Sequence, residues 1–144
     1  MTRKSGKTLT DRNYRTLAEF RHQLRQFLLF SENAARAAGL QPRHHQVLLA
    51  IKGFPDATVG VLAERLGIRP NSAVELVNRL VAAKLIRRVT DTTDRRRVHL
   101  ILTPTAEKRL EDLTRAHHAE LKRLATLWGP LFETLAAETK YPNA

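Results

Sequence analysis

The feature that most constrains the fold is a change in apolar spacing near residue 84. Before it, apolar side chains recur at helical spacing in two short segments separated by Gly67. After it, residues 86–90 and 97–102 show the shorter period typical of strands, and they enclose a polar turn at residues 91–94. Two short helices followed by a β-hairpin are therefore predicted within residues 58–103.

The second predicted helix has two chemically different faces. Pro70 suits its first turn, because a proline lacks only an N–H that would be unbonded there. Apolar side chains at spacings of three and four form one stripe, and polar side chains form the opposite stripe. The polar stripe, with the arginine just before the helix, has side chains of the types that bind base edges or phosphates from a major groove: Arg69, Asn71, Ser72, Glu75, Asn78 and Arg79.

The predicted hairpin is rich in arginine. Five arginines lie within residues 87–97, and only Asp91 and Asp94 oppose them. Such guanidinium groups repel one another unless a polyanion is near. Arg95, Arg96 and Arg97 are therefore candidate contacts to phosphates or to a narrow minor groove. If these three residues lie in a strand, Arg95 and Arg97 share one face and Arg96 takes the other.

Overall charge points to the same class of partner. The chain has 25 Lys and Arg against 14 Asp and Glu, a formal charge of +11, which favours nucleic acid or an anionic membrane surface. Nucleic acid is favoured, because the arginines cluster in a hairpin and not along a helix face. No long apolar run or signal peptide is evident, so we expect a soluble cytoplasmic protein. Cysteine is absent, which excludes disulfides and cysteine-based zinc sites.

The ordered motif in residues 62–104 resembles the MarR family of transcriptional regulators. The matching residues are Arg79-Leu80, Leu85, Arg88, Asp91, Asp94-Arg95-Arg96 and Leu102-Thr103. Lys84 and Ala106 depart from the pattern, since the family usually has Gly at the first position and often at the second. The resemblance implies that Arg96 enters a DNA groove while Asp94 forms a salt bridge with a neighbouring arginine. It also implies an intertwined dimer made by the first and last helices.

Long helices are predicted on both sides of this module. Residues 11–38 and the segment from Pro104 onward carry apolar stripes, the second of which fits a seven-residue repeat up to Trp128. Gly129-Pro130 is expected to interrupt the second helix before a short last one. These stripes either pack within the chain or form a dimer interface, which the resemblance favours, and the candidate interface residues are Tyr14, Leu17, Phe20, Leu121, Leu124, Trp128 and Leu131. We expect residues 1–9 to be a solvated tail, with an extra phosphate contact as the alternative.

The histidines are the remaining candidates for a ligand site. His44 and His45 lie in a predicted helix at residues 42–52, and adjacent helical side chains diverge by about 100°, so one metal ion cannot bind both. His117 falls in an apolar stripe and is expected to be satisfied by a neighbour. The resemblance implies a cleft bounded by the first, second and fifth helices, where His44, His45 and His117 could meet a small aromatic or anionic effector. No metal or other cofactor is expected.

The combined prediction is a mainly α fold with a small β-hairpin wing (α+β), in a single domain of residues 1–144. Residues 42–103 form a winged helix-turn-helix lobe, residues 58–59 add a minimal strand to the hairpin, and residues 11–38 and 104–139 mediate dimerisation. The predicted function is a sequence-specific regulator, a repressor, that binds a pseudo-palindromic operator as a homodimer. A nonspecific architectural binder is the alternative, although Glu75 would only weaken phosphate binding. An enzyme is not expected, because no nucleophile with a base, no glycine-rich phosphate loop and no catalytic residues are evident.

Overall fold

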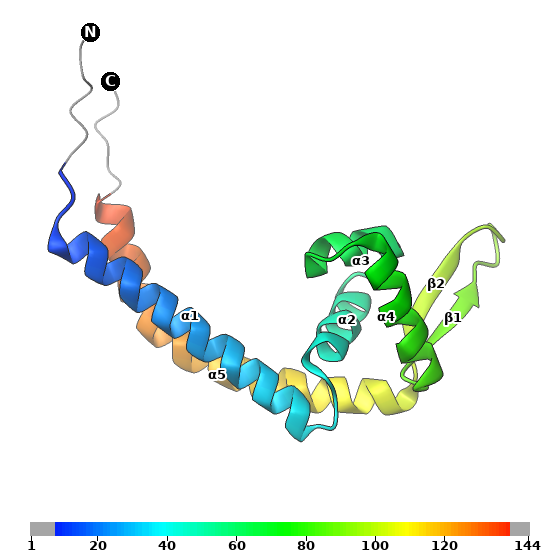
Figure 1. Ribbon diagram of the computed structural model, residues 1–144. Helices are drawn as coiled ribbons and strands as arrows, with labels where there is room; N and C mark the ends of the chain where they lie inside the picture. Colours follow the sequence, from blue (N-terminus) through cyan, green and yellow to red (C-terminus); the bar gives the residue numbers. More distant parts are fainter. Residues whose placement is uncertain (1–7, 139–144) are drawn as a thin grey trace, which may run out of the picture. The chain divides into compact units, whose positions relative to one another are not determined.

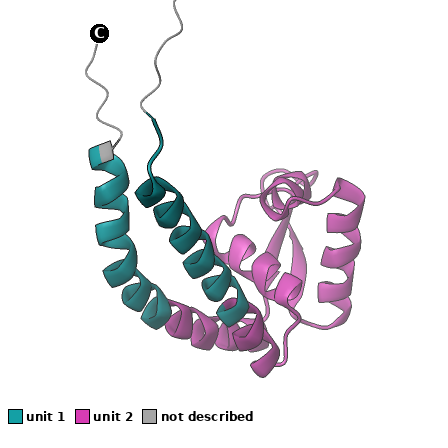
Figure 2. Ribbon diagram, turned by 60° about the vertical axis from the view of Figure 1, so that its left-hand side comes forward, with its two compact units in different colours: residues 1–30, 118–144 teal, residues 31–117 magenta. Residues whose placement is uncertain are grey.

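The computed structural model describes residues 8–138, which divide into two compact units (Figure 2). Residues 31–117 form the larger unit, and residues 8–30 with 118–138 form the smaller one. Helix α1 (Asp11–Ala37) and helix α5 (Pro104–Glu138) contribute to both units. Residues 1–7 of the predicted tail lie outside the described residues. Residue 139, the last of the predicted dimerisation segment, also lies outside them.

The larger unit contains the predicted helix-turn-helix and hairpin. It comprises α2 (Pro42–Gly53), α3 (Val59–Leu66), α4 (Pro70–Ala82), β1 (Ile86–Thr90) and β2 (Val98–Leu102), with the adjoining ends of α1 and α5 (Figure 1). The strands are antiparallel, with Ile86 opposite Leu102 and Thr90 opposite Val98. The prediction of a mainly helical fold with a two-stranded hairpin is confirmed.

One apolar core holds this unit together. Leu48 of α2, Leu62 of α3, Leu80 of α4 and Ile86 of β1 are each at most 1% exposed. Each element therefore contributes its apolar face to a shared centre, and burial of one such side chain is worth about 1.5–3 kcal/mol. The core fixes which face of α4 points outward.

Helices α3 and α4 are both followed by a left-handed residue, but this residue is a glycine only after α3. Gly67 after α3 has a φ of 64°, and Lys84 after α4 has a φ of 57°. The amide of Leu85 bonds the Leu80 carbonyl at 3.0 Å, as in helix ends closed by glycine. Lys84 therefore closes the end of α4 in the left-handed conformation that a glycine adopts more easily, at a conformational cost of about 1 kcal/mol.

The predicted minimal strand at residues 58–59 is wrong. Thr58 is the N-cap of α3, and its hydroxyl oxygen accepts a hydrogen bond from the Val61 amide at 3.3 Å. Val59 is already the first residue of that helix. The cap satisfies an amide that the helix leaves unbonded, which a two-residue strand could not do. Among the described residues the sheet is limited to β1 and β2.

The predicted break at Gly129-Pro130 is also wrong, because α5 continues through Pro130 to Glu138. A proline inside a helix removes one backbone hydrogen bond and crowds the preceding turn. Aromatic packing within the smaller unit spans this defect: the Phe20 ring lies 5.8 Å from that of Trp128 and 5.7 Å from that of Phe132. Contacts on both sides of Pro130 therefore stabilise the continuous helix. No helix in residues 8–138 is both long and apolar enough to span a bilayer.

Candidate nucleic-acid interface

Helix α4 turns its polar stripe to solvent. Ala73, Leu76, Val77 and Leu80 are 0–8% exposed and hold the helix against the core. All the predicted contact residues of this segment are exposed, and they lie at its N-cap or on its outward side: Arg69, Asn71, Ser72, Glu75, Asn78 and Arg79. The fold therefore presents together the side chains that sequence spacing had placed on one face.

A contact between α4 and the hairpin was not predicted. The guanidinium of Arg88 in β1 donates a hydrogen bond to the side-chain oxygen of Asn78. The bond uses the side-chain oxygen of Asn78, and its NH₂ group is not part of it and can donate to another partner. No local pattern signals this pair, since its members are ten residues apart and on different elements. The contact ties the wing to the exposed stripe of α4.

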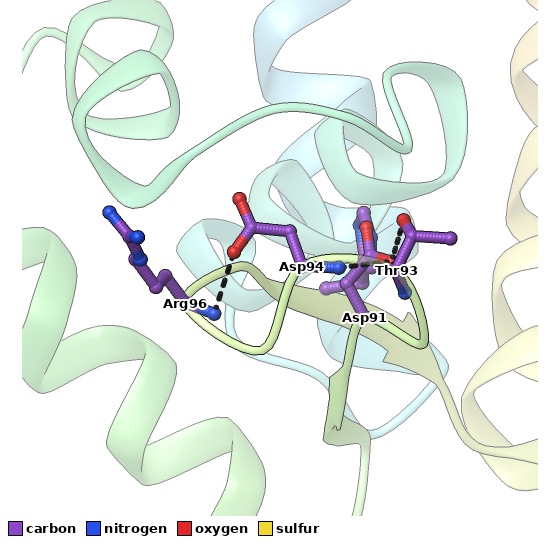
Figure 3. Close-up of polar contacts among 5 residues, drawn as sticks. Asp91, Thr93, Asp94 and Arg96 are labelled. Atoms are coloured by element: carbon purple, nitrogen blue, oxygen red, sulfur yellow. Dashed lines mark hydrogen bonds and ion pairs between the residues drawn. The ribbon is translucent and has the colours of Figure 1, made fainter.

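Asp91 organises the loop between the two strands. One of its carboxylate oxygens accepts hydrogen bonds from the amide and the hydroxyl of Thr93, both at 2.8 Å (Figure 3). The other oxygen lies 2.9 Å from Nε2 of His99. The Thr93 amide above all, followed by His99, holds the pKa of the Asp91 carboxyl well below its usual range. Asp91 therefore stays ionised and fixes the base of the loop.

Asp94 shapes the tip of the loop in a way that corrects the prediction. Its carboxylate accepts a hydrogen bond from the backbone amide of Arg96 at 3.0 Å, and its carbonyl accepts one from the Arg97 amide at 3.0 Å. Within residues 8–138 Asp94 makes no ion pair, so the predicted salt bridge to a neighbouring arginine is wrong. A short carboxylate bonds readily to the amide two residues on, which leaves the Arg96 side chain extended (Figure 3).

The three tip arginines lie in the turn, before β2. Strand β2 begins at Val98, and the backbone turns at Arg95 and Arg96. The predicted alternation of Arg95, Arg96 and Arg97 between two strand faces is therefore wrong, because the Asp94 turn delays the strand by one residue. All three side chains are exposed at the tip of the hairpin.

Within residues 8–138 the guanidinium groups of this surface have no carboxylate partners. Some other cations of the same unit are paired, as Lys52 is with Glu107 at 2.8 Å. Among the described residues, no ion pair is formed by Arg69, Arg79, Arg87, Arg95, Arg96 or Arg97. Unpaired positive charges on one surface attract a polyanion and oppose their own close approach. This surface is suited to phosphate binding.

Two of the predicted effector histidines are in contact inside the unit. The His45 ring is 4% exposed and lies 4.9 Å from that of His117. His117 donates from Nδ1 to the Leu113 carbonyl at 2.7 Å, and its Nε2 lies 2.8 Å from the Ser31 hydroxyl. The expectation that neighbours satisfy His117 is confirmed. Burial first, and then the charge of His117, lower the pKa of His45.

His44 lies apart from this pair, partly exposed. Burial lowers its pKa, with a further contribution from the charge of Arg79. The described residues contain no group of three potential metal ligands among His, Cys, Asp and Glu.

A cavity of about 450 Å³ opens beside α4, and its lining does not include the three histidines. It lies among α1, α2, α3 and α4, with Arg36, Arg43 and Arg79 on its walls and Leu66 and Leu76 among its apolar lining. A smaller cavity of about 330 Å³ adjoins Phe54, whose ring stacks under the guanidinium of Arg65 at 3.5 Å. Sequence reasoning found neither cavity, because each depends on how separate helices pack.

The packed pair α3 and α4, followed by the exposed hairpin, defines a winged helix-turn-helix. Residues 38–97 match the model of the MarR family, and solved members of that family share the fold. The chain is thus similar to the MarR family over its helix-turn-helix and wing. This agrees with the resemblance first seen in the arginine-rich wing.

Relatives with curated names support the assignment. The chain is 33% identical over 88 residues to the uncharacterised HTH-type transcriptional regulator YcgE of Bacillus subtilis, which covers 61% of this chain and 57% of the relative. It is 29% identical over 85 residues to the HTH-type transcriptional repressor MdtR of the same organism, covering 59% and 55%. The chain thus spans little more than half the length of these relatives. Both names describe regulators and not enzymes.

Solved structures match nearly the whole fold at low identity. A MarR family protein from Bacillus stearothermophilus gives a TM-score of 0.71 at 17% identity, covering 93% of this chain and all of that one. A mutant of S. aureus MepR bound to an oligodeoxyribonucleotide gives 0.66 at 19% identity, covering 92% of this chain and all of that one. At such identities the likeness concerns the fold alone.

Proposed function

We propose that this chain is a sequence-specific DNA-binding transcriptional regulator that acts in the cytoplasm as a homodimer. The observation that carries the proposal is the exposed polar stripe of α4 beside a wing whose guanidinium groups have no carboxylate partner in the part of the chain that the structure describes. Helix α4 enters a major groove, where Asn71 and Asn78 meet base edges. The oligonucleotide bound by MepR supports DNA as the ligand of this fold.

The wing supplies the second contact. Arg96 reaches the adjacent minor groove, and Arg95 and Arg97 meet the phosphates beside it. The Asp91 network holds the loop in place before DNA arrives, so little loop entropy is lost on binding. Phosphate contacts provide most of the affinity, and α4 with the wing tip provides the choice of sequence.

Dimerisation through the smaller unit is supported by its exposed apolar side chains. Tyr14 and Leu17 are 61% and 58% exposed, and Leu121 and Phe132 are 40% and 48% exposed. So much apolar surface on a small helical unit is typical of a protein interface. Leu124 also belongs to the predicted interface residues, but it is 0% exposed and therefore packs inside its own unit.

The remaining predicted interface residues, Phe20, Trp128 and Leu131, are half-buried within the unit. The buried Nε1 of Trp128 has no hydrogen-bond acceptor in residues 8–138. A partner protomer would cover the aromatic cluster that this indole forms with Phe20 and Phe132. The two-fold symmetry of the dimer places the two α4 helices about one turn of DNA apart, so the operator is a pseudo-palindrome.

The regulator acts as a repressor, as the name of MdtR describes for that relative. A small aromatic or anionic effector releases it by favouring a spacing of the two lobes that no longer matches the DNA. His44, His45 and His117 remain the predicted effector residues of the cleft bounded by the first, second and fifth helices. Their contribution is tested by replacing each with glutamine and measuring operator release by aromatic acids.

The test is a binding titration with two duplexes of equal length and composition. One carries the promoter region of the chain's own gene, and the other carries a scrambled sequence. We expect the promoter duplex to bind at least about 10³-fold more tightly. Asn71→Ala and Asn78→Ala should reduce this preference more than they reduce the affinity for scrambled DNA. Equal affinities for both duplexes would support the alternative, a nonspecific architectural binder.

A further inference from the structure

The contact that joins the wing to the polar stripe of α4 carries a further inference. The guanidinium of Arg88 in β1 donates a hydrogen bond to the side-chain oxygen of Asn78 in α4. A guanidinium has no acceptor, so only the oxygen of the Asn78 amide, and not its nitrogen, can be the partner. The bond therefore fixes which way round the amide lies: its oxygen is held by Arg88, and its NH₂ group remains available to a second partner.

The place of Arg88 follows from the fold of the hairpin. Ile86 is 1% exposed and belongs to the core, and Arg88, two residues further along β1, lies on the same side of the sheet. Its partner across the ladder is Leu100, which is 8% exposed and also belongs to the core. Strand β1 packs against α4 (Figure 1). The long side chain of Arg88 therefore reaches from the edge of the core to the exposed face of that helix.

Asn78 lies on the face of α4 that the proposed function directs into a major groove. Asn71, Glu75 and Asn78 follow one another at helical spacings of four and three, and all three are exposed. Within residues 8–138 Arg88 forms no ion pair. Its guanidinium therefore brings an uncompensated positive charge, and N–H groups beyond the one bonded to Asn78, to this face.

The bond changes which bases Asn78 can recognise. Asparagine commonly binds adenine through two hydrogen bonds, one donated to N7 and one accepted from the N6 amino group. Here the accepting oxygen already bonds a cation, whose charge repels the partly positive hydrogens of a base amino group. The NH₂ group of Asn78 and the other N–H groups of Arg88 are all donors. Guanine matches such a set, because it presents two neighbouring acceptors, N7 and O6, in the major groove.

We propose that Asn78 and Arg88 act as one donor unit that selects guanine over adenine at one position of the DNA site. Arg88 is a specificity-determining residue, and it acts partly by orienting the Asn78 amide. The wing thereby sets the base preference of α4 in the major groove, in addition to the minor-groove contact assigned to its tip. This inference rests on the proposed function, because it needs α4 in the major groove.

The first experiment tests the contact without DNA. The side-chain amide signals of Asn78 are compared by NMR in the unaltered protein, Arg88→Ala and Arg87→Ala. Arg87 is the matched control, because it is exposed, carries the same charge and lies on the other side of the sheet, opposite Ile101. We expect the Asn78 signals to shift in Arg88→Ala and to stay in place in Arg87→Ala. Unchanged signals in Arg88→Ala would overturn the proposal.

The second experiment selects preferred sites from a library of random duplexes. The motif of the unaltered protein and of Arg87→Ala should contain a guanine that Asn78→Ala loses. In Arg88→Ala the same position should accept adenine as well, because the Asn78 oxygen can then accept from N6. A motif that Arg88→Ala leaves unchanged would overturn this proposal and leave the proposed function standing. If no protein enriches a motif, the proposed function fails and this proposal fails with it.

Titration by fluorescence anisotropy gives the size of the effect. The selected duplex is compared with one that carries adenine at the guanine position and one that carries 7-deazaguanine, which lacks the N7 acceptor. Adenine should weaken binding to the unaltered protein by about 5- to 150-fold, the value of one bidentate base contact, and 7-deazaguanine should weaken it by less. Both losses should shrink in Arg88→Ala and Asn78→Ala and persist in Arg87→Ala.

A phosphate contact gives a different result from a base contact. Arg87→Ala and Arg88→Ala both remove one positive charge, so both can lower the affinity for every duplex, and only the ratio between duplexes tests the proposal. If neither replacement of the guanine weakens binding while Arg88→Ala lowers the salt dependence, the pair binds a phosphate and the proposal is wrong. Arg88→Lys keeps the charge but has fewer donors, so it should recover only part of the preference for guanine. Thermal unfolding of each variant checks that it folds.

Discussion

Replacing the three tip arginines of the wing provides a quantitative test of how this protein meets DNA. Arg95, Arg96 and Arg97 are exposed and form no ion pair among the described residues, so each can displace counterions from DNA, Arg95 and Arg97 at phosphates and Arg96 in the minor groove. In a dimer, alanine at all three positions removes three guanidinium groups from each protomer. Each neutralised phosphate contributes about 0.9 to the slope of log affinity against log salt, so the slope should fall by up to about 5.

This change is large enough to measure by fluorescence anisotropy. Between about 50 and 200 mM salt, the unaltered protein should lose up to roughly 10³-fold more affinity than the variant. The fold should survive, because the bonds at Asp91 and Asp94 involve backbone amides, Thr93 and His99, and none uses an arginine side chain.

The control for this prediction removes the same charge elsewhere. Arg12, Arg15 and Arg25 are exposed residues of α1 in the smaller unit, and alanine at all three positions should change the slope by less than about 1. If the wing variant and the control variant show equal slopes, the wing makes no phosphate contact and the reasoning is refuted.

Three other predictions concern stability and assembly. Lys84→Gly should raise the free energy of unfolding by roughly 0.5–1 kcal/mol, because it relieves a φ of 57°. Ala83→Gly, at a φ of −77°, should lower it. If urea unfolding changes in the same direction for both variants, Lys84 is not strained. His45 has a folded pKa below its ordinary 6.5, so unfolding free energy should be highest above pH 6.5 and fall as the pH drops below it. His45→Gln should flatten that pH profile, and an unchanged profile would exclude His45 as the cause. Leu17→Asp, at a side chain that is 58% exposed, should convert a dimer to a monomer in sedimentation and shift Trp128 emission to the red; a dimer of unchanged stability would place the interface elsewhere.

Local signals in the sequence predicted most of the fold. Gly67 ends α3, and Thr103 begins α5, where its hydroxyl oxygen accepts a hydrogen bond from the Ala106 amide at 3.3 Å. The apolar spacing of α4 also fixed which side chains are exposed, because a helix with one apolar face has little choice of orientation. Predictions based on such short-range physics were confirmed.

Features that depend on distant contacts were missed or wrong. Pro130 was expected to end a helix, but packing of Phe20 against the rings on both sides of it outweighs the local preference. The bond between Arg88 and Asn78 and the cavity walled by Arg43 arise only when separate elements meet. Spacing along a chain contains no information about which side chains will share a cavity.

The most direct test of the account is a chemical footprint of the purified chain on the promoter region of its own gene. The account predicts two protected half-sites, related by a pseudo-palindrome, with centres about one helical turn apart and protected minor grooves flanking them. A single unpaired protected segment, or uniform protection along the duplex, would contradict it.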